Sequence, residues 1–352
     1  MISTQPLPAY ELTGSDLTEL DRSLAELDGP GLDPGGSEFY EQDGIDAGRL
    51  PAGLRGFLRR FRTHEPAAAC LIRGLPVAAD RIGPTPASWR TAAVDRTRRE
   101  QVYLALVASA LGDVFSWSTL QDGRLIAHVV PIQGEDTQQS GHGQVLLEWH
   151  TEDGFHPYRC DYLLLFGMRN EDRTPTTVAS VRDVTLTTEQ RRVLAGERFH
   201  ILPDDEHLRQ LAAVRPEHPA LAQMRRMRTD PEPVAVLFGD ETAPYLRIDP
   251  FFMRPVDGDT AAAAALDAIV AELARVQQDV VVDAGTLLVV DNYLAVHGRR
   301  AFTARFDGTD RWLMKAIVTR DLRKSRSARS SAASRLLHDH SRSGLARTGA
   351  PA

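Results

Sequence analysis

The chain has 352 residues, 42% of them hydrophobic and 25% charged, which is the composition of a water-soluble globular protein. No apolar run approaches the roughly 20 residues of a membrane-spanning helix, and the N-terminus has neither a basic start nor an apolar signal core, so we expect a cytoplasmic protein. Residues 321–352 hold seven Lys/Arg against two Asp, a net charge of +5, which leaves −12 on residues 1–320 within an overall charge of −7. An acidic body argues against a nucleic-acid-binding surface.

The pattern of apolar residues in the first third of the chain predicts three helices and one buried strand. Apolar residues recur at helical spacing over residues 15–28, 53–64 and 98–114, and Ser15 can cap the first of these helices. The apolar run 68–77 ends in Gly-Leu-Pro, which is typical of a buried strand.

After residue 114 the pattern changes to short β-branched and aromatic runs separated by turn residues, which predicts a strand-rich region. Three stretches within it have helical periodicity, at residues 187–195, 205–213 and 260–276. The predicted strands cover residues 115–120, 124–132, 145–150, 161–169, 176–181, 235–239, 245–249, 278–285, 286–292 and 312–320.

We therefore expect a mainly β chain with flanking helices, built on a double-stranded β-helix (a jelly roll of the cupin type) with a helical insertion. A single domain would span residues 1–320, with helical support in 1–115, the jelly-roll core in 116–320 and the insertion at about 185–235. A doubly wound βαβ sheet is the competing fold, and the lack of a glycine-rich phosphate motif after a strand disfavours it. The Ser/Arg/Ala-rich tail, 321–352, predicts disorder.

A candidate metal site lies in the sequence Trp-His-Thr-Glu-Asp at residues 149–153. On an extended strand, side chains two residues apart project from one face, so His150 and Glu152 could present an imidazole and a carboxylate to one ion. A second histidine would complete the 2-His-1-carboxylate set of non-haem iron oxygenases. The short motif alone favours a surface strand with a polar end, so the metal site depends on the context of the motif.

The partners of this motif are expected in the run DAGTLLVVDNYLAVHGRRAF, residues 283–302, which ends near His297. Fourteen residues after His297, Arg311 opens a strongly strand-like segment. A return of hairpin size would bring the Arg311 guanidinium back beside the metal.

Together, His150-Thr-Glu152, the later His297-Gly-Arg and Arg311 resemble the Fe(II)/2-oxoglutarate oxygenases of the clavaminate synthase-like group. The closest likeness is to the free amino-acid hydroxylases of the L-arginine 3-hydroxylase and asparagine oxygenase type. It runs from about Ala69 to Thr319, and includes the whole of GQVLLEWHTEDGFHPYRCDYLLLFGMRN and the upstream segment FSWSTLQDGRL.

The resemblance implies that His150, Glu152 and His297 hold Fe(II), and that 2-oxoglutarate and O2 are co-substrates. The reaction would hydroxylate an unactivated side-chain carbon, C3 or C4, of a free L-amino acid in specialised peptide metabolism, with succinate and CO2 as by-products. Arg311 would grip the distal carboxylate of 2-oxoglutarate with its planar fork. A hydroxyl would assist, with Thr177 as the first choice and Thr176 as the second, although either could be a plain strand residue.

By the same resemblance, the amino-acid site is lined by Leu120, Gln121, Ser140, Glu152, Asp249, Phe251 and Lys315. Two of these depart from the arginine hydroxylases, where Phe251 is the second Asp of an Asp-x-Asp pair and Lys315 is an Arg. Loss of a buried carboxylate that faces a cationic substrate group weakens binding of that substrate. We therefore expect an arginine-shaped substrate with a less cationic end, such as citrulline or an amide, with arginine itself still open.

Two other functions stay open at this point. One is an oxidase of the same fold that desaturates or cyclises an amino acid, since the iron ligands do not dictate the step after hydrogen abstraction. The other is a non-catalytic jelly-roll binding protein, which the intact metal ligands and Arg311 weigh against. The basic run 224–228 is interpreted either as a lid over the substrate or as a solvated face.

Overall fold

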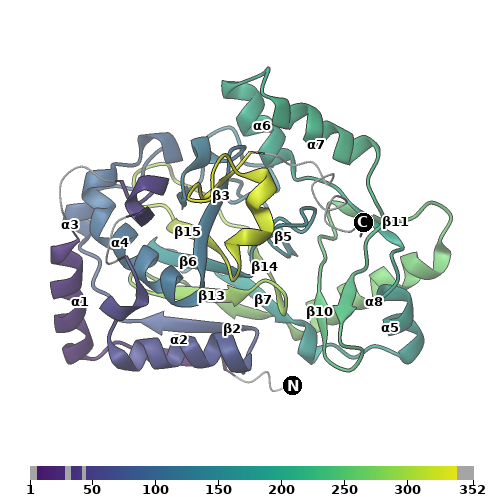
Figure 1. Ribbon diagram of the computed structural model, residues 1–352, viewed down its shortest axis with the longest axis horizontal. Coiled ribbons are helices and arrows are strands. Elements are labelled where there is room, and N and C mark those ends of the chain that lie inside the picture. Colours follow the sequence, from purple (N-terminus) through teal and green to yellow (C-terminus); the bar gives the residue numbers. More distant parts are fainter. Residues whose placement is uncertain (1–5, 28–32, 42–44, 339–352) are drawn as a thin grey trace, which may run out of the picture.

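The computed structural model describes residues 6–27, 33–41 and 45–338 (Figure 1). Its helices are α1 (Gly14–Glu26), α2 (Ala52–His64), α3 (Ala79–Ile82), α4 (Val94–Leu111), α5 (Thr188–Leu194), α6 (Asp205–Val214), α7 (Pro219–Thr229) and α8 (Thr260–Val276). Its strands are β1 (Ala9–Glu11), β2 (Ala69–Arg73), β3 (Asp113–Trp117), β4 (Ile126–Val129), β5 (Leu147–His150), β6 (Tyr162–Arg169), β7 (Thr176–Ser180), β8 (Phe199–Ile201), β9 (Leu237–Gly239), β10 (Pro244–Leu246), β11 (Met253–Pro255), β12 (Gln278–Val280), β13 (Leu287–Asp291), β14 (Ala295–Arg299), β15 (Trp312–Thr319) and β16 (Leu336–Leu337).

Two sheets form the centre of the molecule. The larger has the order β1-β2-β13-β6-β15-β3-β16, and β4 also pairs with β15. The smaller has the order β12-β7-β14-β5. Strands distant in the chain are neighbours in both sheets, so residues near 150, 177, 297 and 315 come within reach of one another.

The larger sheet is buried on both faces, which explains why its central strands are apolar at nearly every position. Along β6, Tyr162, Leu164 and Phe166 pack into the core shared with α1, α2 and α4. The alternate residues Leu163 and Leu165 pack into a second core, which is shared with the smaller sheet and α8. The strand period of two thus assigns successive side chains to two different cores.

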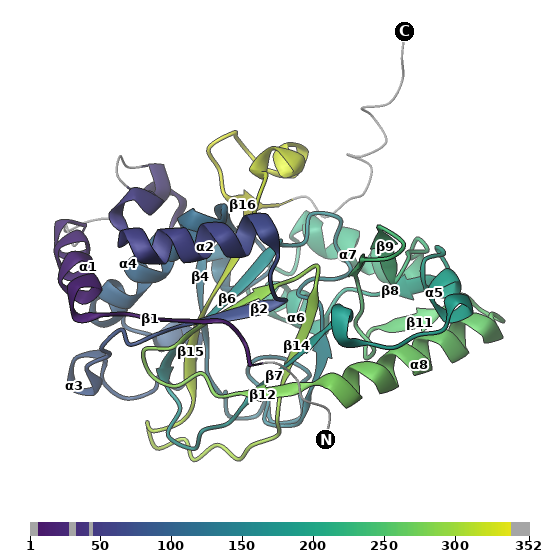
Figure 2. The ribbon, with the colours of Figure 1, turned by 90° about the horizontal axis from the view of Figure 1, so that it is seen from below.

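The helices lie on three sides of these sheets (Figure 1). The N-terminal helices α1 to α4 gather at one end, and α5 and α8 lie at the other end. The view from below shows the same separation (Figure 2). Helices α6 and α7, from the middle of the chain, lie over the region between the two ends.

The structure corrects the expectation of a mainly β chain, because helices hold more of the described residues than strands do, and the fold is mixed α/β. The helical excess comes from the N-terminal support, the insertion and α8. The helices predicted at 15–28, 53–64 and 260–276 are confirmed within two residues at each end. The strand predicted at 245–249 ends at Leu246, so Asp249 lies in a loop.

The C-terminal segment also differs from expectation as far as residue 338. A 3-10 helix covers Leu322–Ala328, and β16 pairs in parallel with the edge strand β3, with Leu336 opposite Ser116. Leu337 is fully buried. The prediction of disorder is therefore wrong for residues 321–338, because Leu336 and Leu337 pair with β3 and Leu337 packs into the core beside it. Residues 339–352 lie outside the described residues.

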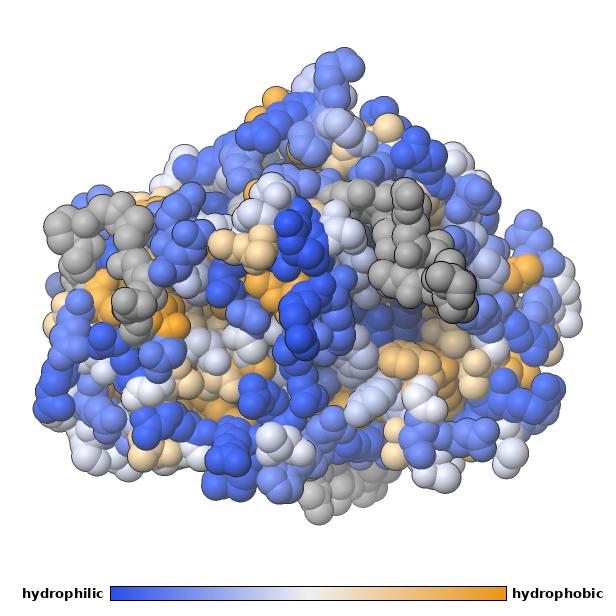
Figure 3. All heavy atoms as spheres, in the orientation of Figure 1, coloured by the Kyte–Doolittle hydropathy of each residue, from blue (hydrophilic) through white to orange (hydrophobic). Residues whose placement is uncertain are grey.

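The face of the molecule in Figure 3 is mostly hydrophilic, with hydrophobic side chains in separate small areas. Among the described residues, no helix is both long and apolar enough to cross a membrane.

Candidate active site

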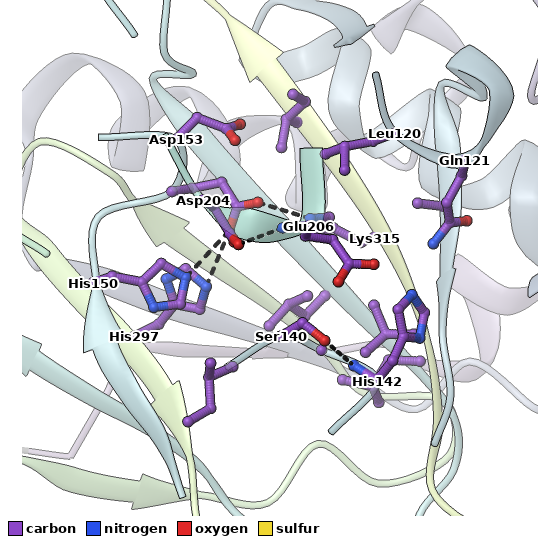
Figure 4. A pocket seen from close by; sticks show the side chains of 18 of the residues that line it. Leu120, Gln121, Ser140, His142, His150, Asp153, Asp204, Glu206, His297 and Lys315 are labelled. Atoms are coloured by element: carbon purple, nitrogen blue, oxygen red, sulfur yellow. Dashed lines mark hydrogen bonds and ion pairs between the residues drawn. The ribbon is translucent and has the colours of Figure 1, made fainter. Parts of the chain in front are cut away.

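The two candidate metal-binding histidines face each other across a β-ladder. His150 ends β5 and pairs in register with His297 of β14, so their rings lie 4.5 Å apart between centroids. The Glu152 carboxylate oxygen Oε2 lies 3.2 Å from Nε2 of His297 and 3.9 Å from Nε2 of His150. One ligand atom from each of the three lies within 4.8 Å of the others, which is the compactness that a single ion requires. Figure 4 shows the two histidine rings, His150 and His297, close together in the cavity.

Glu152 reaches this position by a turn rather than by strand alternation, which corrects the sequence interpretation. Strand β5 ends at His150, and Asn292 then holds the backbone of the following turn. The side chain of Asn292 accepts a hydrogen bond from the Glu152 N–H (2.7 Å) and donates to the Glu152 carbonyl (3.0 Å) and to the Cys160 carbonyl (3.0 Å). The Asn292 side chain, directly after β13, thus fixes the backbone position from which the Glu152 carboxylate projects.

Gly298 allows the two strands to approach at the metal site. A Cβ at this position would lie 2.5 Å from the Leu147 carbonyl oxygen and 2.9 Å from the Thr177 hydroxyl. No real Cβ is tolerated at such distances from backbone. The glycine that follows His297 in the sequence is therefore required by the packing of β14 between β5 and β7.

The charges around Glu152 keep it in the form that binds a metal. Burial alone would raise the pKa of Glu152, but Lys315, His297 and His150 lower it well below its usual value. Burial and the neighbouring His150 lower the pKa of His297. Burial opposes protonation of His150 too, yet Asp249 and Glu152 raise its pKa, so metal binding and protonation compete for this ring.

Arg311 is a buried cation with a hydroxyl partner in place of a carboxylate. Its Nη2 donates to the Thr176 hydroxyl at 3.0 Å, whereas its Nε is buried without a partner. Burial and the nearby Arg299 lower the pKa of Arg311 to about 9. A buried guanidinium with unused donors fits the carboxylate of a small anion, and 2-oxoglutarate offers one.

Thr176, rather than Thr177, is the hydroxyl on the cavity side. Thr176 lines the main cavity together with Arg311. Thr177 pairs with Gly298, and its hydroxyl is buried without a partner. Neighbouring residues of a strand point to opposite faces, so Thr176 is the one that contacts the cavity here, and the assignment of either hydroxyl to 2-oxoglutarate stays a prediction.

Arg299 is a second buried guanidinium beside Arg311. Its Nη2 donates to the Val145 carbonyl at 2.7 Å, and its Nη1 lies 3.3 Å from the Gly141 carbonyl. Burial lowers its pKa to about 10. Arg299 therefore holds the loop that carries Ser140, and it adds positive charge to the Arg311 side of the cavity.

The main cavity has a volume of about 130 Å³ and joins the metal cluster to the predicted substrate residues. One face of β15 lines it with Arg311, Leu313, Lys315 and Ile317, in steps of two. Leu120, Gln121 and Ser140 line it as well. The Gln121 amide is already committed, because it donates to the His128 carbonyl and accepts from the His128 N–H, each at 2.9 Å.

Asp249 and Phe251 lie in a smaller adjoining pocket, which shares His150 and Asp204 with the main cavity. Asp249 is partly buried, whereas Phe251 is 54% exposed. Asp204 is the N-cap of α6. Burial raises the pKa of Asp204 to about 7, with Glu206 and Asp249 adding to the shift, and burial also raises the pKa of Asp249.

Several residues that line the cavity were not found from the sequence. They are Asp153, Asp204, Glu206, His207, His142 and Arg299. The available signals were weak: Arg299 follows the His-Gly motif, and Asp204 directly precedes a predicted helix. Helix α6 and its N-cap supply four of the residues that line the cavity.

The basic run 224–228 does not line the cavity. That basic run belongs to α7, where Arg225 and Arg226 are exposed.

Two imidazoles and one carboxylate lie around one point, and the same cavity holds a buried arginine with no acidic partner among the described residues. These are the working parts of a non-haem iron oxygenase that uses a 2-oxo acid. Comparison with known proteins agrees, and the chain belongs to the TauD/TfdA family. Residues 106–317 match the model of the family described as taurine catabolism dioxygenase TauD, TfdA family.

Similar proteins act on amino acids. The chain is 41% identical to an enduracididine beta-hydroxylase of Streptomyces hygroscopicus, over 93% of this chain and 98% of that protein. It is 37% identical to an L-ornithine/L-arginine 3-hydroxylase of Catenulispora acidiphila, with the same two coverages. A crystal structure of the non-heme iron oxygenase OrfP with Fe, succinate and (3S)-hydroxy-L-Arg superposes with a TM-score of 0.88, at 39% identity, over 94% of this chain and 99% of that chain.

Proposed function

We propose that this chain is a non-haem iron, 2-oxoglutarate-dependent hydroxylase of free L-arginine or a closely related cationic amino acid. His150, Glu152 and His297 hold Fe(II), and 2-oxoglutarate and O2 are the co-substrates. The product is a hydroxylated amino acid for specialised metabolism. The two central sheets correspond, in this proposal, to the double-stranded β-helix of the family.

The distribution of charge along the cavity is the observation that carries the proposal. Arg311 and Arg299 are buried without an acidic partner, and Asp204 and Asp249 form no ion pair within the described residues. Unpaired buried charges are expensive. A dianionic 2-oxo acid on the arginine side and a cationic side chain on the aspartate side would offset both costs.

Each group then has a stated task. Bound iron and 2-oxoglutarate supply the oxidising power of the reaction. Arg311 and Thr176 orient the distal carboxylate of 2-oxoglutarate. Lys315 faces the substrate carboxylate from β15, while Asp204 and Asp249 hold the cationic end, so the intervening side-chain carbons are presented to the metal side of the cavity.

The relatives support this substrate class. OrfP has been solved with Fe and alpha-ketoglutaric acid and with Fe and L-Arg. Enduracididine beta-hydroxylase and L-ornithine/L-arginine 3-hydroxylase are named for amino acids with cationic side chains.

Because Phe251 is exposed, its replacement of an aspartate is weak evidence against a cationic substrate. That side chain is 54% exposed, so an aspartate there would act largely through solvent. Asp204, from the helical insertion, supplies the second carboxylate beside Asp249. A neutral citrulline would leave both unpaired, and we therefore place arginine ahead of citrulline.

The experiment is an anaerobic titration with Fe(II) and 2-oxoglutarate that follows the visible charge-transfer band, and then addition of O2 with arginine, homoarginine, citrulline or asparagine. We expect the band, succinate formation that depends on arginine, and a product that has gained one oxygen atom. Loss of two hydrogens would instead indicate desaturation or cyclisation. Clear preference for citrulline would contradict the assignment of Asp204 and Asp249.

Two substitutions provide the controls. His297→Ala removes one iron ligand and should abolish both the band and succinate formation. His64→Ala changes an exposed histidine at the end of α2 and should leave both unchanged. A folded wild-type protein with no band would mean that the three ligands do not bind iron.

A further inference from the structure

Helix α6 makes polar side-chain contacts with three other segments around the cavity. The N–H of Gln121 donates to the Gln210 side chain at 2.7 Å. Arg209 forms a two-pronged ion pair with Glu135, with one contact at 2.9 Å. The helix is thus joined to the predicted substrate strand and to the loop before β5, and it carries Asp204 at its N-cap.

The third contact reaches the metal-ligand turn itself. Nε2 of His207 lies 2.9 Å from Oδ1 of Asp153, and Nδ1 of His207 lies 2.6 Å from the Thr119 hydroxyl. With a proton on Nε2, the ring donates to Asp153, and its Nδ1 can accept from the Thr119 hydroxyl. Phe155 and Trp117 flank the ring edge-to-face, at centroid distances of 5.2 and 6.0 Å.

Asp153 directly follows the iron ligand Glu152, and its backbone needs support. Its φ is +49°, a left-handed conformation that is uncommon for residues other than glycine. The Trp117 indole donates to Oδ2 of Asp153 at 2.6 Å, while His207 contacts the other oxygen. Both carboxylate oxygens are thus held by side chains from other elements, one of which belongs to α6.

We infer that His207 is a positioning residue that couples the packing of α6 against the substrate cavity to the placement of Glu152 at the metal. The inference rests on the proposed function, because Asp204 on the same helix is the group assigned to the substrate cation. When a cation engages Asp204, α6 is held against the cavity. The His207–Asp153 contact then holds the turn that presents Glu152, so substrate binding and metal geometry are reinforced together.

Two substitutions separate the polar contacts of His207 from its packing. His207→Phe keeps an aromatic ring between Phe155 and Trp117 but removes both hydrogen bonds. His207→Gln keeps a donor for Asp153 and loses part of the packing. We expect His207→Phe to raise KM for arginine between about 5- and 100-fold and to lower the hydroxylated product formed per succinate, and His207→Gln to recover most of both.

A second readout is independent of turnover. Hydrogen–deuterium exchange of the folded protein with Fe(II) and 2-oxoglutarate, without O2, reports on the stability of local backbone structure. In the wild type, arginine should protect residues 205–214 and the turn 151–156 together. In His207→Phe, arginine should protect the two segments to different extents, while the charge-transfer band stays.

Arg228→Ala is the matched control. It breaks the ion pair between Arg228 and Asp205 of α6, which lies within the insertion and away from the metal turn, so KM and the product ratio should stay at the wild-type values. His207→Phe with wild-type KM, product ratio and exchange would overturn the coupling. A wild type that makes no arginine-dependent succinate would instead contradict the proposed function, which separates the two failures.

Discussion

Lys315 of β15 forms an ion pair with Glu152, the carboxylate of the proposed metal site, with Nζ 2.7 Å from Oε1. The other oxygen, Oε2, is the one that faces the two histidines. Burial opposes the charge on Lys315, but Glu152 and Asp153 raise its pKa. The ammonium thus stays charged beside the iron ligands, where it can also meet a substrate carboxylate.

Replacement of Lys315 by Met should weaken binding of the amino acid more than it weakens the iron centre. Loss of one partner of a buried charge pair costs roughly 2–5 kcal/mol, which predicts a rise in KM for arginine of at least about 30-fold. Initial rates at saturating 2-oxoglutarate measure this rise, and the charge-transfer band checks that iron is bound. Lys315→Arg should keep much of the affinity, and an unchanged KM in Lys315→Met would exclude a substrate contact.

The pair Thr176 and Thr177 offers a matched test of the 2-oxoglutarate site. Thr176→Val removes the hydroxyl that accepts from Arg311, and a hydrogen bond to a charged group contributes about 1.5–3 kcal/mol. KM for 2-oxoglutarate should rise at least about 10-fold, whereas Thr177→Val should leave it within about twofold. Equal effects of the two substitutions would mean that the strand face is assigned wrongly.

Asn292→Ala tests the backbone clamp on the metal-ligand turn. The side chain makes three hydrogen bonds with backbone groups of Glu152 and Cys160, all of them buried. Loss of such support around a metal ligand typically costs 10–100-fold in metal affinity, so the Fe(II) dissociation constant should rise by about this factor. Titration of apoprotein measures it, and helix α4, which is remote from this clamp, should keep its exchange pattern if the fold is intact.

The parts of the site that lie on strands could be predicted from the sequence. Arg311 directly precedes β15 and Lys315 lies on it four residues later, so the period of two of the extended chain points both toward the cavity. His150 ends a predicted strand, whereas His297 lies beyond the predicted strand 286–292, in the run expected to reach the metal, and the structure pairs the two histidines directly. Local pattern was sufficient here because strand geometry fixes the direction of each side chain.

The parts that depend on the path of the insertion could not be predicted. The helix at 205–213 was expected, but nothing local indicates that His207 contacts Asp153, which is 54 residues away in the chain. The same holds for Asn292, which clamps Glu152 across 140 residues, and for Leu336, which pairs with β3. In each case the partner is set by the tertiary fold, and the residue type alone fits many surface positions.

The pH dependence of arginine turnover should report on Asp204. Burial raises its pKa to about 7, Glu206 and Asp249 raise it further, and His207 opposes the shift. Only the ionised carboxylate attracts a guanidinium, and the ionised fraction grows as pH rises through 7. With Fe(II) and 2-oxoglutarate saturating, kcat/KM for arginine should therefore rise with pH up to about 7 and then level off.

Asp204→Asn should lower kcat/KM for arginine and remove this inflection, because the amide does not titrate. Asp205→Asn is the adjacent control: Asp205 is exposed and pairs with Arg228 instead of facing the cavity, so its profile should match the wild type. The charge-transfer band, followed over the same pH range, separates loss of iron from loss of substrate affinity. An inflection near 7 that persists in Asp204→Asn would assign it to another group and would weaken the case for a cationic substrate at this end of the cavity.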